Sequence, residues 1–279
     1  MQGRIVKNIS NDYTVRTTNE VFTCKARGKF KNIGLTPMVG DIVTFNPDTK
    51  YIMNIQRRKN QLIRPFVSNV DQAIIVTSVK EPNFSSNLLD KLLTIISFNN
   101  ITPIICLTKL DLLNKEEQQE INKIVSYYKS IGYQVIENTK KQELTKVLKN
   151  KINVFTGQSG SGKSTLINKL DKNLNLKTDT ISKSLGRGKH TTRHTELYEI
   201  NGGYIVDTPG FSSVDFHGMS KLDIRDNMND MFDNLEYCKY RDCLHLNEDG
   251  CYVKKLVADN KILKTRYENY LKFISQLRR

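Results

Sequence analysis

The chain has 279 residues, of which 38% are hydrophobic and 26% are charged. This length and composition predict a folded protein with a substantial core and more than one domain. The amino terminus lacks the apolar core of a secretory signal, and no stretch approaches the roughly 20 apolar residues that cross a bilayer. We therefore expect a cytoplasmic protein with no membrane partner.

The net charge of +14 is unevenly distributed along the chain. Residues 1–64 hold 12 Lys and Arg against 4 Asp and Glu, residues 65–251 hold 23 against 23, and residues 252–279 hold 8 against 2. Two basic flanks around a neutral middle favour binding of a polyanion. Nucleic acid is favoured over a membrane surface, because no basic amphipathic segment with Trp is present.

The first sixty residues predict a small β-barrel. Short alternating runs, separated by turn residues, predict strands at residues 3–7, 13–17, 20–25, 41–45 and 51–55. Five strands without helical periodicity are typical of an OB-like barrel, which presents a basic and aromatic face to RNA or single strands. Residues 27–31 would then form a basic loop in which Phe30 stacks on a base, and a plain solvated turn is the alternative.

From Val70 onward, apolar strands alternate with longer helical stretches. The pattern predicts strands at residues 71–77, 102–107, 133–136, 152–155 and 204–206, and helices at residues 87–98, 115–131, 142–150 and 162–170. This alternation predicts a mostly parallel sheet covered on both faces, with a nucleotide site at the carboxyl ends of its strands.

Residues 108–111 read Thr-Lys-Leu-Asp and follow one of these strands. The carboxylate of Asp111 can accept from both N1–H and the exocyclic amine of guanine, a donor pair that adenine lacks. Lys109 would lay its aliphatic stem along the base, and Thr108 stands where many GTPases carry Asn. The alternative is a helix start that merely contains Lys and Asp. Residues 138–140, where a loop backing the base would lie, match such loops poorly and receive no role.

Residues 157–164 match the phosphate-loop pattern G-x-x-x-x-G-K-[ST], between an expected strand and an expected helix. The glycines let backbone N–H groups point at phosphate oxygens beside a helix amino terminus. Lys163 would reach the β and γ phosphates, and Ser164 would bind Mg²⁺. The expected GTP contacts in this loop are Gly157, Gln158, Ser159, Gly160, Ser161, Gly162, Lys163, Ser164 and Thr165.

Two further segments complete the expected nucleotide site. Asp207-Thr-Pro-Gly210 follows an apolar strand, so Asp207 would hold the magnesium ion and the N–H of Gly210 would sense the γ-phosphate. In the glycine-rich, basic stretch 185–194, either Thr191 or Thr192 would complete the magnesium shell.

This sequence lacks a catalytic side chain that many GTPases carry. Phe211 occupies the position at which many GTPases carry a water-orienting Gln, so we expect slow unaided hydrolysis. We expect the catalytic groups to be Lys163, Thr192 and His190. A neutral imidazole at His190 can accept from the attacking water, and an RNA contact is an equal alternative for this side chain.

The order of these motifs is unusual. The guanine motif at residues 108–111 precedes the phosphate loop, which precedes residues 207–210, whereas in an ordinary GTPase the guanine motif follows the other two. The sequence therefore predicts a circularly permuted P-loop GTPase domain.

The carboxy-terminal part predicts a metal site between two helical stretches, residues 221–235 and the basic residues 252–279. Five cysteines in a chain without an export signal favour metal ligation over structural disulfides. Cys24 and Cys106 lie alone in apolar runs and are expected to be small buried hydrophobes. Three thiolates and one imidazole at close spacing suit one structural, tetrahedral Zn²⁺. These expected ligands are Cys238, Cys243, His245 and Cys251.

Taken together, these residues resemble the circularly permuted GTPases of the RsgA/YjeQ/YloQ family. The most specific segments are residues 186–192, residues 207–211 and the Cys/His set. The resemblance covers nearly the whole chain and implies a multidomain α/β protein. It implies an OB-fold RNA-binding domain at residues 1–64, a permuted GTPase domain at 65–217, and a mostly helical zinc-binding domain with a basic helix at 218–279.

The resemblance also implies an activity. It implies slow hydrolysis of GTP to GDP and phosphate, stimulated by the 30S ribosomal subunit, in late maturation of that subunit. It implies contact of the flanking modules with 16S rRNA and release after hydrolysis, and we expect a monomer. Two alternatives are a nucleic-acid-binding protein whose nucleotide site is a sensor with negligible turnover, and a small-molecule kinase or ATPase, which Asp111 disfavours.

Overall fold

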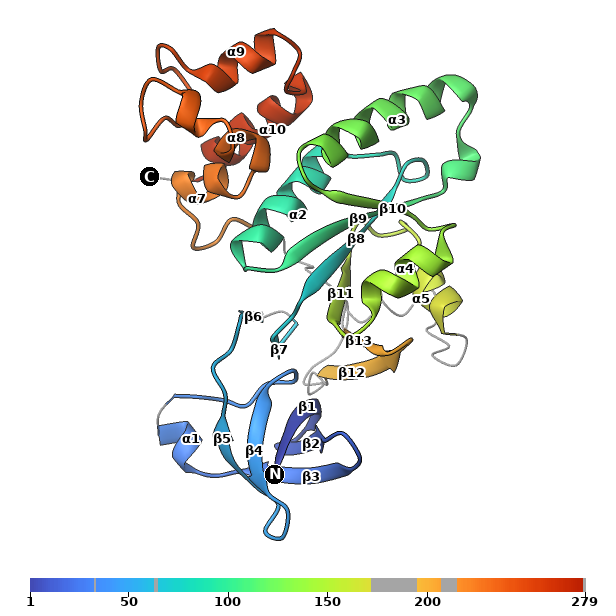
Figure 1. Ribbon diagram of the computed structural model, residues 1–279, viewed down its shortest axis with the longest axis vertical. Helices are drawn as coiled ribbons and strands as arrows, with labels where there is room; N and C mark the ends of the chain where they lie inside the picture. Colours follow the sequence, from blue (N-terminus) through green and yellow to red (C-terminus); the bar gives the residue numbers. More distant parts are fainter. Residues whose placement is uncertain (33, 63–64, 172–194, 207–214, 278–279) are drawn as a thin grey trace, which may run out of the picture. The chain divides into compact units, whose positions relative to one another are not determined.

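The computed structural model describes residues 1–32, 34–62, 65–171, 195–206 and 215–277, coloured in chain order in Figure 1. The chain divides into two units. The first comprises Met1–Ile74, Lys140–Thr156 and Gly162–Ser212, and the second comprises Ile75–Thr139, Gly157–Ser161 and Ser213–Arg279.

Five strands close into a barrel at the start of the first unit. They are β1 (Gln2–Ile9), β2 (Asp12–Arg16), β3 (Val21–Ala26), β4 (Ile42–Asn46) and β5 (Tyr51–Ile55). They pair in the order β1-β2-β3-β5-β4, and β4 pairs back with β1, with Gln2 opposite Thr44. Alternate residues such as Ile5, Val15 and Val43 fill the interior. The expected five-stranded barrel is confirmed, and each strand lies within two residues of its predicted position.

The basic segment after β3 differs from its prediction. It contains the short helix α1 (Lys29–Asn32), and Phe30 is only 3% exposed. An aromatic ring buried to this extent cannot stack on a base, so the prediction for Phe30 is wrong. Burying this apolar ring stabilises the fold more than leaving the ring exposed to water would. Cys24 is buried in β3, as expected.

The rest of the first unit contains three further strands of the same hydrogen-bonded sheet. Strand β11 (Ile152–Thr156) pairs in parallel with β13 (Gly203–Val206), and β12 (Thr195–Ile200) pairs antiparallel with both β13 and β1. Helices α4 (Lys141–Leu148) and α5 (Lys163–Leu170) flank β11 in sequence. Strand β12 was not predicted, although its Thr-Glu-Leu-Tyr-Glu-Ile sequence alternates as a strand should.

The second unit contains the strands and helices around the guanine motif. Strands β9 (Thr102–Thr108) and β10 (Gln134–Glu137) pair in parallel, and α2 (Ser86–Phe98) contacts β9 while α3 (Lys115–Ser130) contacts β10 (Figure 1). Strand β8 (Gln72–Ser78) carries the chain from the first unit into the second, after the short strands β6 (Gln61–Leu62) and β7 (Val67–Ser68). The predicted α/β alternation is confirmed.

The remainder of the second unit is helical in the residues that the structure describes. It contains α7 (Lys221–Asp226), α8 (Asn229–Phe232), the 3₁₀ helix η2 (Leu235–Tyr237), α9 (Tyr252–Ala258) and α10 (Lys264–Gln276). We call residues 215–277 the C-terminal module. Its apolar core includes Phe216, Met228 and Phe273, and Ile95 of α2 belongs to the same cluster.

Both long helices predicted in this module are interrupted. The first ends at Asn227, whose side-chain amide donates to the Asp223 carbonyl, and Met228 is extended. The second is broken between α9 and α10, where Asn260 adopts a left-handed conformation with a φ of 55°. Asn tolerates this conformation, which commonly ends a helix.

Among the described residues, we find no helix with the length and apolarity that a membrane crossing requires. The units do not follow the three predicted domains, because the C-terminal module shares its unit with α2 and α3. The boundaries near residues 64 and 217 therefore stay a prediction.

Candidate nucleotide and metal sites

The guanine motif lies at the carboxyl end of β9, as the sequence predicts. Thr108 is 2% exposed, and its hydroxyl donates to the carbonyl of Ser161 at 2.7 Å. Lys109 adopts a left-handed conformation that turns the chain into the 3₁₀ helix η1 (Leu110–Leu112), in which Asp111 is exposed. The Thr108 hydroxyl therefore braces the phosphate loop, while the Asp111 carboxylate remains accessible to a ligand.

A loop that was not predicted lies against this motif. Residues 79–84 connect β8 to α2, and the backbone N–H of Val79 donates to the Thr108 carbonyl at 3.2 Å. The ammonium group of Lys109 donates to the carbonyl of Glu81. No sequence pattern marks this loop, because its contact with Lys109 is made by a backbone carbonyl. We call residues 79–84 the base-side loop.

The glycines of the phosphate loop hold backbone conformations that side chains disfavour. Gly157 has a φ of 134°, and a Cβ atom there would lie 2.1 Å from the carbonyl oxygen of Val76, so only glycine fits. Gly160 and Gly162 also have positive φ values. The buried hydroxyl of Ser161 has no hydrogen-bond partner among the described residues. The conformation is that of a loop whose backbone turns sharply before a helix.

Helix α5 begins at Lys163, directly after Gly162, and no side chain caps its amino terminus. The first N–H groups of such a helix attract an anion. Ser164 lies in the first turn and is largely buried. Burial lowers the pKa of the Lys163 ammonium, because desolvation penalises its charge, and a phosphate group beside it would oppose that effect. The local structure thus has the features of an anion site.

The remaining nucleotide residues of the sequence prediction lie outside the described residues. They are His190, Thr191, Thr192, Asp207 and Gly210. Their roles in magnesium binding, phosphate sensing and catalysis stay predictions.

The four predicted metal ligands come together in the C-terminal module. One ligand atom from each of Cys238, Cys243, His245 and Cys251 lies within 4.8 Å of the others. The Nδ1 atom of His245 is 3.6 Å from Sγ of Cys238 and 3.4 Å from Sγ of Cys251. A tetrahedral zinc ion would separate a sulfur and a nitrogen ligand by about 3.5 Å. The donor set and its spacing fit a metal ion.

Neighbouring groups orient these ligands. The Nε2 atom of His245 lies 3.2 Å from the Met231 carbonyl, and because a carbonyl only accepts, Nε2–H donates and Nδ1 keeps its lone pair for a metal. Burial lowers the pKa of His245, which favours the neutral ring. Burial also raises the pKa of the Cys243 thiol to about 12, so a thiolate there needs a nearby cation.

The loop that carries the ligands is itself tied in place. The carboxylate of Glu248 accepts from the N–H groups of Leu244 and Leu246 at 2.8 and 2.6 Å, and Arg225 of α7 donates to the Cys243 carbonyl at 3.2 Å. This arrangement holds four potential ligands, the number that a structural zinc site takes from the protein.

Comparison with known proteins agrees with this geometry. The sequence profile of the RsgA GTPase family matches residues 55–217, and that of the RsgA N-terminal domain matches residues 2–52. The chain belongs to the RsgA GTPase family. A small ribosomal subunit biogenesis GTPase RsgA 2 from Oceanobacillus iheyensis is 45% identical, over 99% of this chain and 97% of the relative. The RsgA GTPase of Bacillus pumilus is 44% identical with the same coverage.

Two solved structures share the fold of this RsgA family member. YloQ, described as a circularly permuted GTPase, superposes with a TM-score of 0.85 at 36% identity, over 99% of this chain and 94% of that one. YjeQ from Thermotoga maritima gives a TM-score of 0.87 at 33% identity, over 100% and 99% of the two chains. The predicted circular permutation is confirmed at the level of the family.

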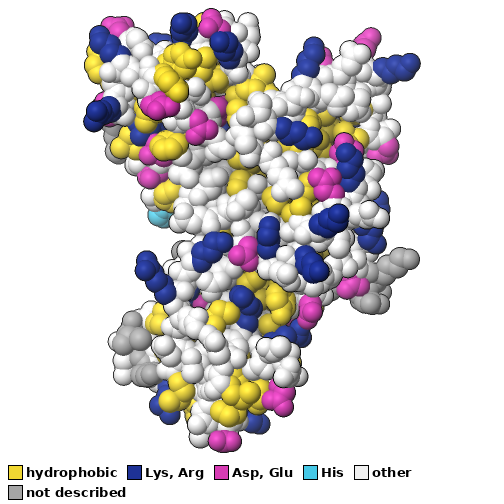
Figure 2. Space-filling view, in the orientation of Figure 1, with side chains coloured by type: hydrophobic (Ala, Val, Ile, Leu, Met, Phe, Trp, Pro, Cys, Tyr) yellow, Lys and Arg dark blue, Asp and Glu magenta, His cyan; other side chains and the backbone are white. Residues whose placement is uncertain are grey.

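On one face of the molecule (Figure 2), the charges are more mixed than the sequence partition indicates. On the face drawn in Figure 2, Lys and Arg side chains are spread widely and alternate with Asp and Glu, without one continuous basic patch. In the C-terminal module, residues 218–251 hold 4 Lys and Arg against 8 Asp and Glu, whereas residues 252–277 hold 6 against 2, so the module as a whole has no basic excess.

Proposed function

We propose that this GTPase assists late maturation of the 30S ribosomal subunit, hydrolysing GTP to GDP and phosphate slowly and faster when bound to that subunit. The observation that carries the proposal is family membership over the full chain, together with relatives named for small ribosomal subunit biogenesis. The braced phosphate loop and the accessible Asp111 support binding of a guanine nucleotide.

In this proposal, different residues of the chain bind the base, the phosphates and the magnesium ion of GTP. Asp111 accepts from the guanine edge, Lys109 lies along the base, and the loop from Gly157 to Thr165 cradles the phosphates. Mg²⁺ would be held by Ser164 with Thr191 or Thr192 and Asp207, and it would neutralise charge on the phosphates. His190 would accept from the attacking water.

We further propose that the Cys/His cluster holds one structural zinc ion. The observations that support zinc are the all-N/S donor set and the spacing of the ligand atoms. Ligation would fix the loop of residues 238–251, which has few apolar side chains to hold it. The partners proposed with this function are 16S rRNA, bound by both basic flanks of a cytoplasmic monomer that does not bind membranes.

The proposed function is tested by measuring GTP and ATP hydrolysis with and without purified 30S subunits. We expect GTP turnover to be slow alone and to rise with 30S subunits, and ATP turnover to stay at background. Turnover that does not respond to 30S subunits would refute the proposal. Tight GTP binding without turnover in either condition would favour the nucleotide sensor, for which Phe211 is the supporting feature.

Association with 30S subunits should weaken steeply as salt rises, because phosphate contacts release counterions. Nucleotide could also change how the C-terminal module contacts RNA, because residues 207–211 immediately precede that module in the chain. The protease sensitivity and 30S affinity of residues 217–279, compared between GTP and GDP, test this coupling. No difference between the nucleotides would contradict it.

A further inference from the structure

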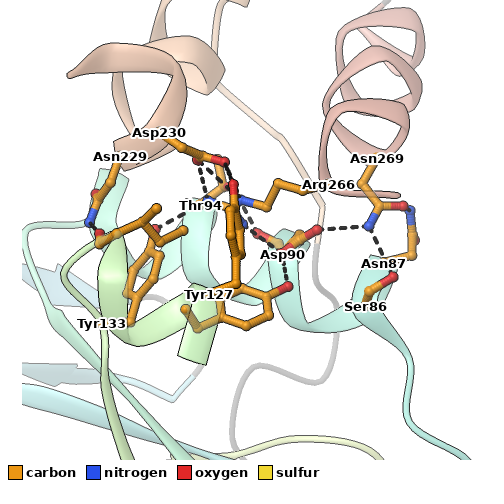
Figure 3. A network of polar contacts seen from close by, with 12 residues as sticks. Ser86, Asn87, Asp90, Thr94, Tyr127, Tyr133, Asn229, Asp230, Arg266 and Asn269 are labelled. Carbon is orange, nitrogen blue, oxygen red and sulfur yellow. Dashed lines mark hydrogen bonds and ion pairs between the residues drawn. The ribbon is translucent and has the colours of Figure 1, made fainter. Parts of the chain in front are cut away.

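A buried cluster of polar side chains joins the C-terminal module to α2 (Figure 3). The guanidinium of Arg266 in α10 is 1% exposed and donates to Asp90 of α2 at 2.5 Å and to Asp230 of α8 at 2.9 Å. It also lies over the rings of Tyr128 and Tyr133, at 5.6 and 5.7 Å from their centroids. A guanidinium enclosed in this way is stabilised by the two carboxylates that face it, so the Arg266 side chain ties α10 to both α2 and α8.

Helix α3 completes the cluster. The Tyr128 hydroxyl donates to Asp90 at 2.6 Å, and the Tyr127 hydroxyl donates to Asp230 at 2.6 Å. Each carboxylate thus receives a hydroxyl as well as the guanidinium, and four helices meet at one point. We call Arg266, Asp90, Asp230, Tyr127 and Tyr128 the Arg266 cluster.

Asn269, one turn further along α10, binds the first turn of α2 (Figure 3). Its side-chain N–H groups donate to Asp90 at 2.7 Å and to the Ser86 hydroxyl at 3.3 Å, and its oxygen accepts from the Asn87 amide at 2.9 Å. Because Asn269 is buried, water could not replace these hydrogen bonds if they were lost. The C-terminal module therefore holds the start of α2 directly.

The base-side loop runs straight into this turn of α2. Its last residue, Phe84, lines a small apolar pocket together with Leu89 of α2 and Ile105 of β9. At its other end, the carbonyl of Glu81 accepts from Lys109 of the guanine motif. The Cδ atom of Pro82 is 3.6 Å from the Cβ position of Gly160 in the phosphate loop. One short loop thus connects the guanine motif to the helix that Asn269 holds.

We propose that Asn269 and the Arg266 cluster are positioning residues for guanine binding: the C-terminal module fixes the start of α2, α2 fixes the base-side loop, and that loop orients Lys109. The base-side loop contacts the guanine motif, which would bind the base that GDP and GTP share. The affinities for GDP and GTP should therefore be affected alike. The inference goes beyond the proposed function, because it assigns the C-terminal module a part in nucleotide affinity without the ribosome.

The test replaces Asn269 by Leu, which has a similar volume, and measures the Kd of labelled GDP and GTP, kcat at saturating GTP, and bound metal. We expect both Kd values to rise about fivefold or more, by the same factor, with kcat within about twofold of wild type. The matched control is Glu268→Ala, the exposed neighbour on α10, which should bind both nucleotides as wild type does. Loss of affinity in a variant that keeps its metal cannot be attributed to a collapsed module.

Unchanged GDP affinity in a folded Asn269→Leu variant, or an equal loss in Glu268→Ala, overturns the inference. Should Asn269→Leu fail to fold, Asn87→Ala removes only the amide that donates to the Asn269 oxygen, and it should weaken both nucleotides in the same direction. Unchanged binding in Asn87→Ala likewise overturns the inference. Guanine binding by the wild-type chain tests the proposed function, whereas equal binding by variant and wild type refutes only this positioning role.

Discussion

Replacing Arg266 by Met would leave two buried carboxylates without their cation. Burial raises the pKa of Asp90, and the Arg266 guanidinium opposes that rise, so the pKa of Asp90 should climb further in the variant. Removing one partner of a buried ion pair costs about 3–5 kcal/mol of unfolding free energy. That is a large fraction of the roughly 5–15 kcal/mol that stabilises a typical domain.

Urea unfolding followed by tyrosine fluorescence measures this cost, because the chain has 12 Tyr and no Trp. The cost relative to wild type should shrink as the pH is lowered from neutral. With its pKa raised in the folded state, Asp90 binds a proton there at a pH at which the unfolded state does not, so lowering the pH stabilises the folded variant. Lys272→Met, an exposed change on α10, should cost less than about 0.5 kcal/mol. A loss below about 1 kcal/mol for Arg266→Met at neutral pH, or a loss that does not shrink as the pH is lowered, would refute the reasoning.

Three further substitutions test the candidate sites. Cys243→Ser should lower bound zinc well below one per chain by atomic absorption and destabilise the C-terminal module; full zinc content would show that the ligand assignment is wrong. Gly157→Ala should abolish measurable GDP binding in calorimetry, because its Cβ would lie 2.1 Å from the Val76 carbonyl oxygen. Thr108→Val keeps the shape but loses the hydrogen bond to Ser161, so GDP affinity should fall about tenfold, as expected for about 1.4 kcal/mol, whereas Thr108→Ser should retain it.

Local sequence patterns predicted most of the elements because those elements depend on local periodicity. The barrel strands alternate strictly, and α3 begins at a capping box formed by Asn114 and Glu117. The predictions were wrong where tertiary contacts or single turn residues determine the local structure. Phe30 lies in a basic segment but is buried, and Asn260 ends a helix in a stretch whose overall composition is helical.

The candidate sites also differ in whether local sequence could predict them. The phosphate loop and the metal cluster were predictable, because each is built from residues close in sequence whose spacing is fixed by the ligand. The Arg266 cluster was not predictable, because Asp90, Asp230 and Arg266 are far apart in the chain. One signal was present: Asp90 interrupts the apolar run Leu88-Leu89-Asp90-Lys91-Leu92, and an acid on a buried helix face requires a partner.

Phe216 lies at the start of the C-terminal module, and its contact bears on how nucleotide could act on the module. Phe216 closely follows the predicted phosphate-sensing motif in the chain, is 3% exposed, and packs against Phe273 of α10 with ring centroids 5.0 Å apart. Helix α10 therefore receives both the chain leaving that motif and, through Asn269, the helix that follows the base-side loop. Because α10 also holds the start of α2 through Asn269, a Phe216→Ala variant should change the ratio of GTP to GDP affinity, whereas Asn269→Leu should leave that ratio unchanged. Equal effects on the ratio would show that these two contacts of α10 do not act separately.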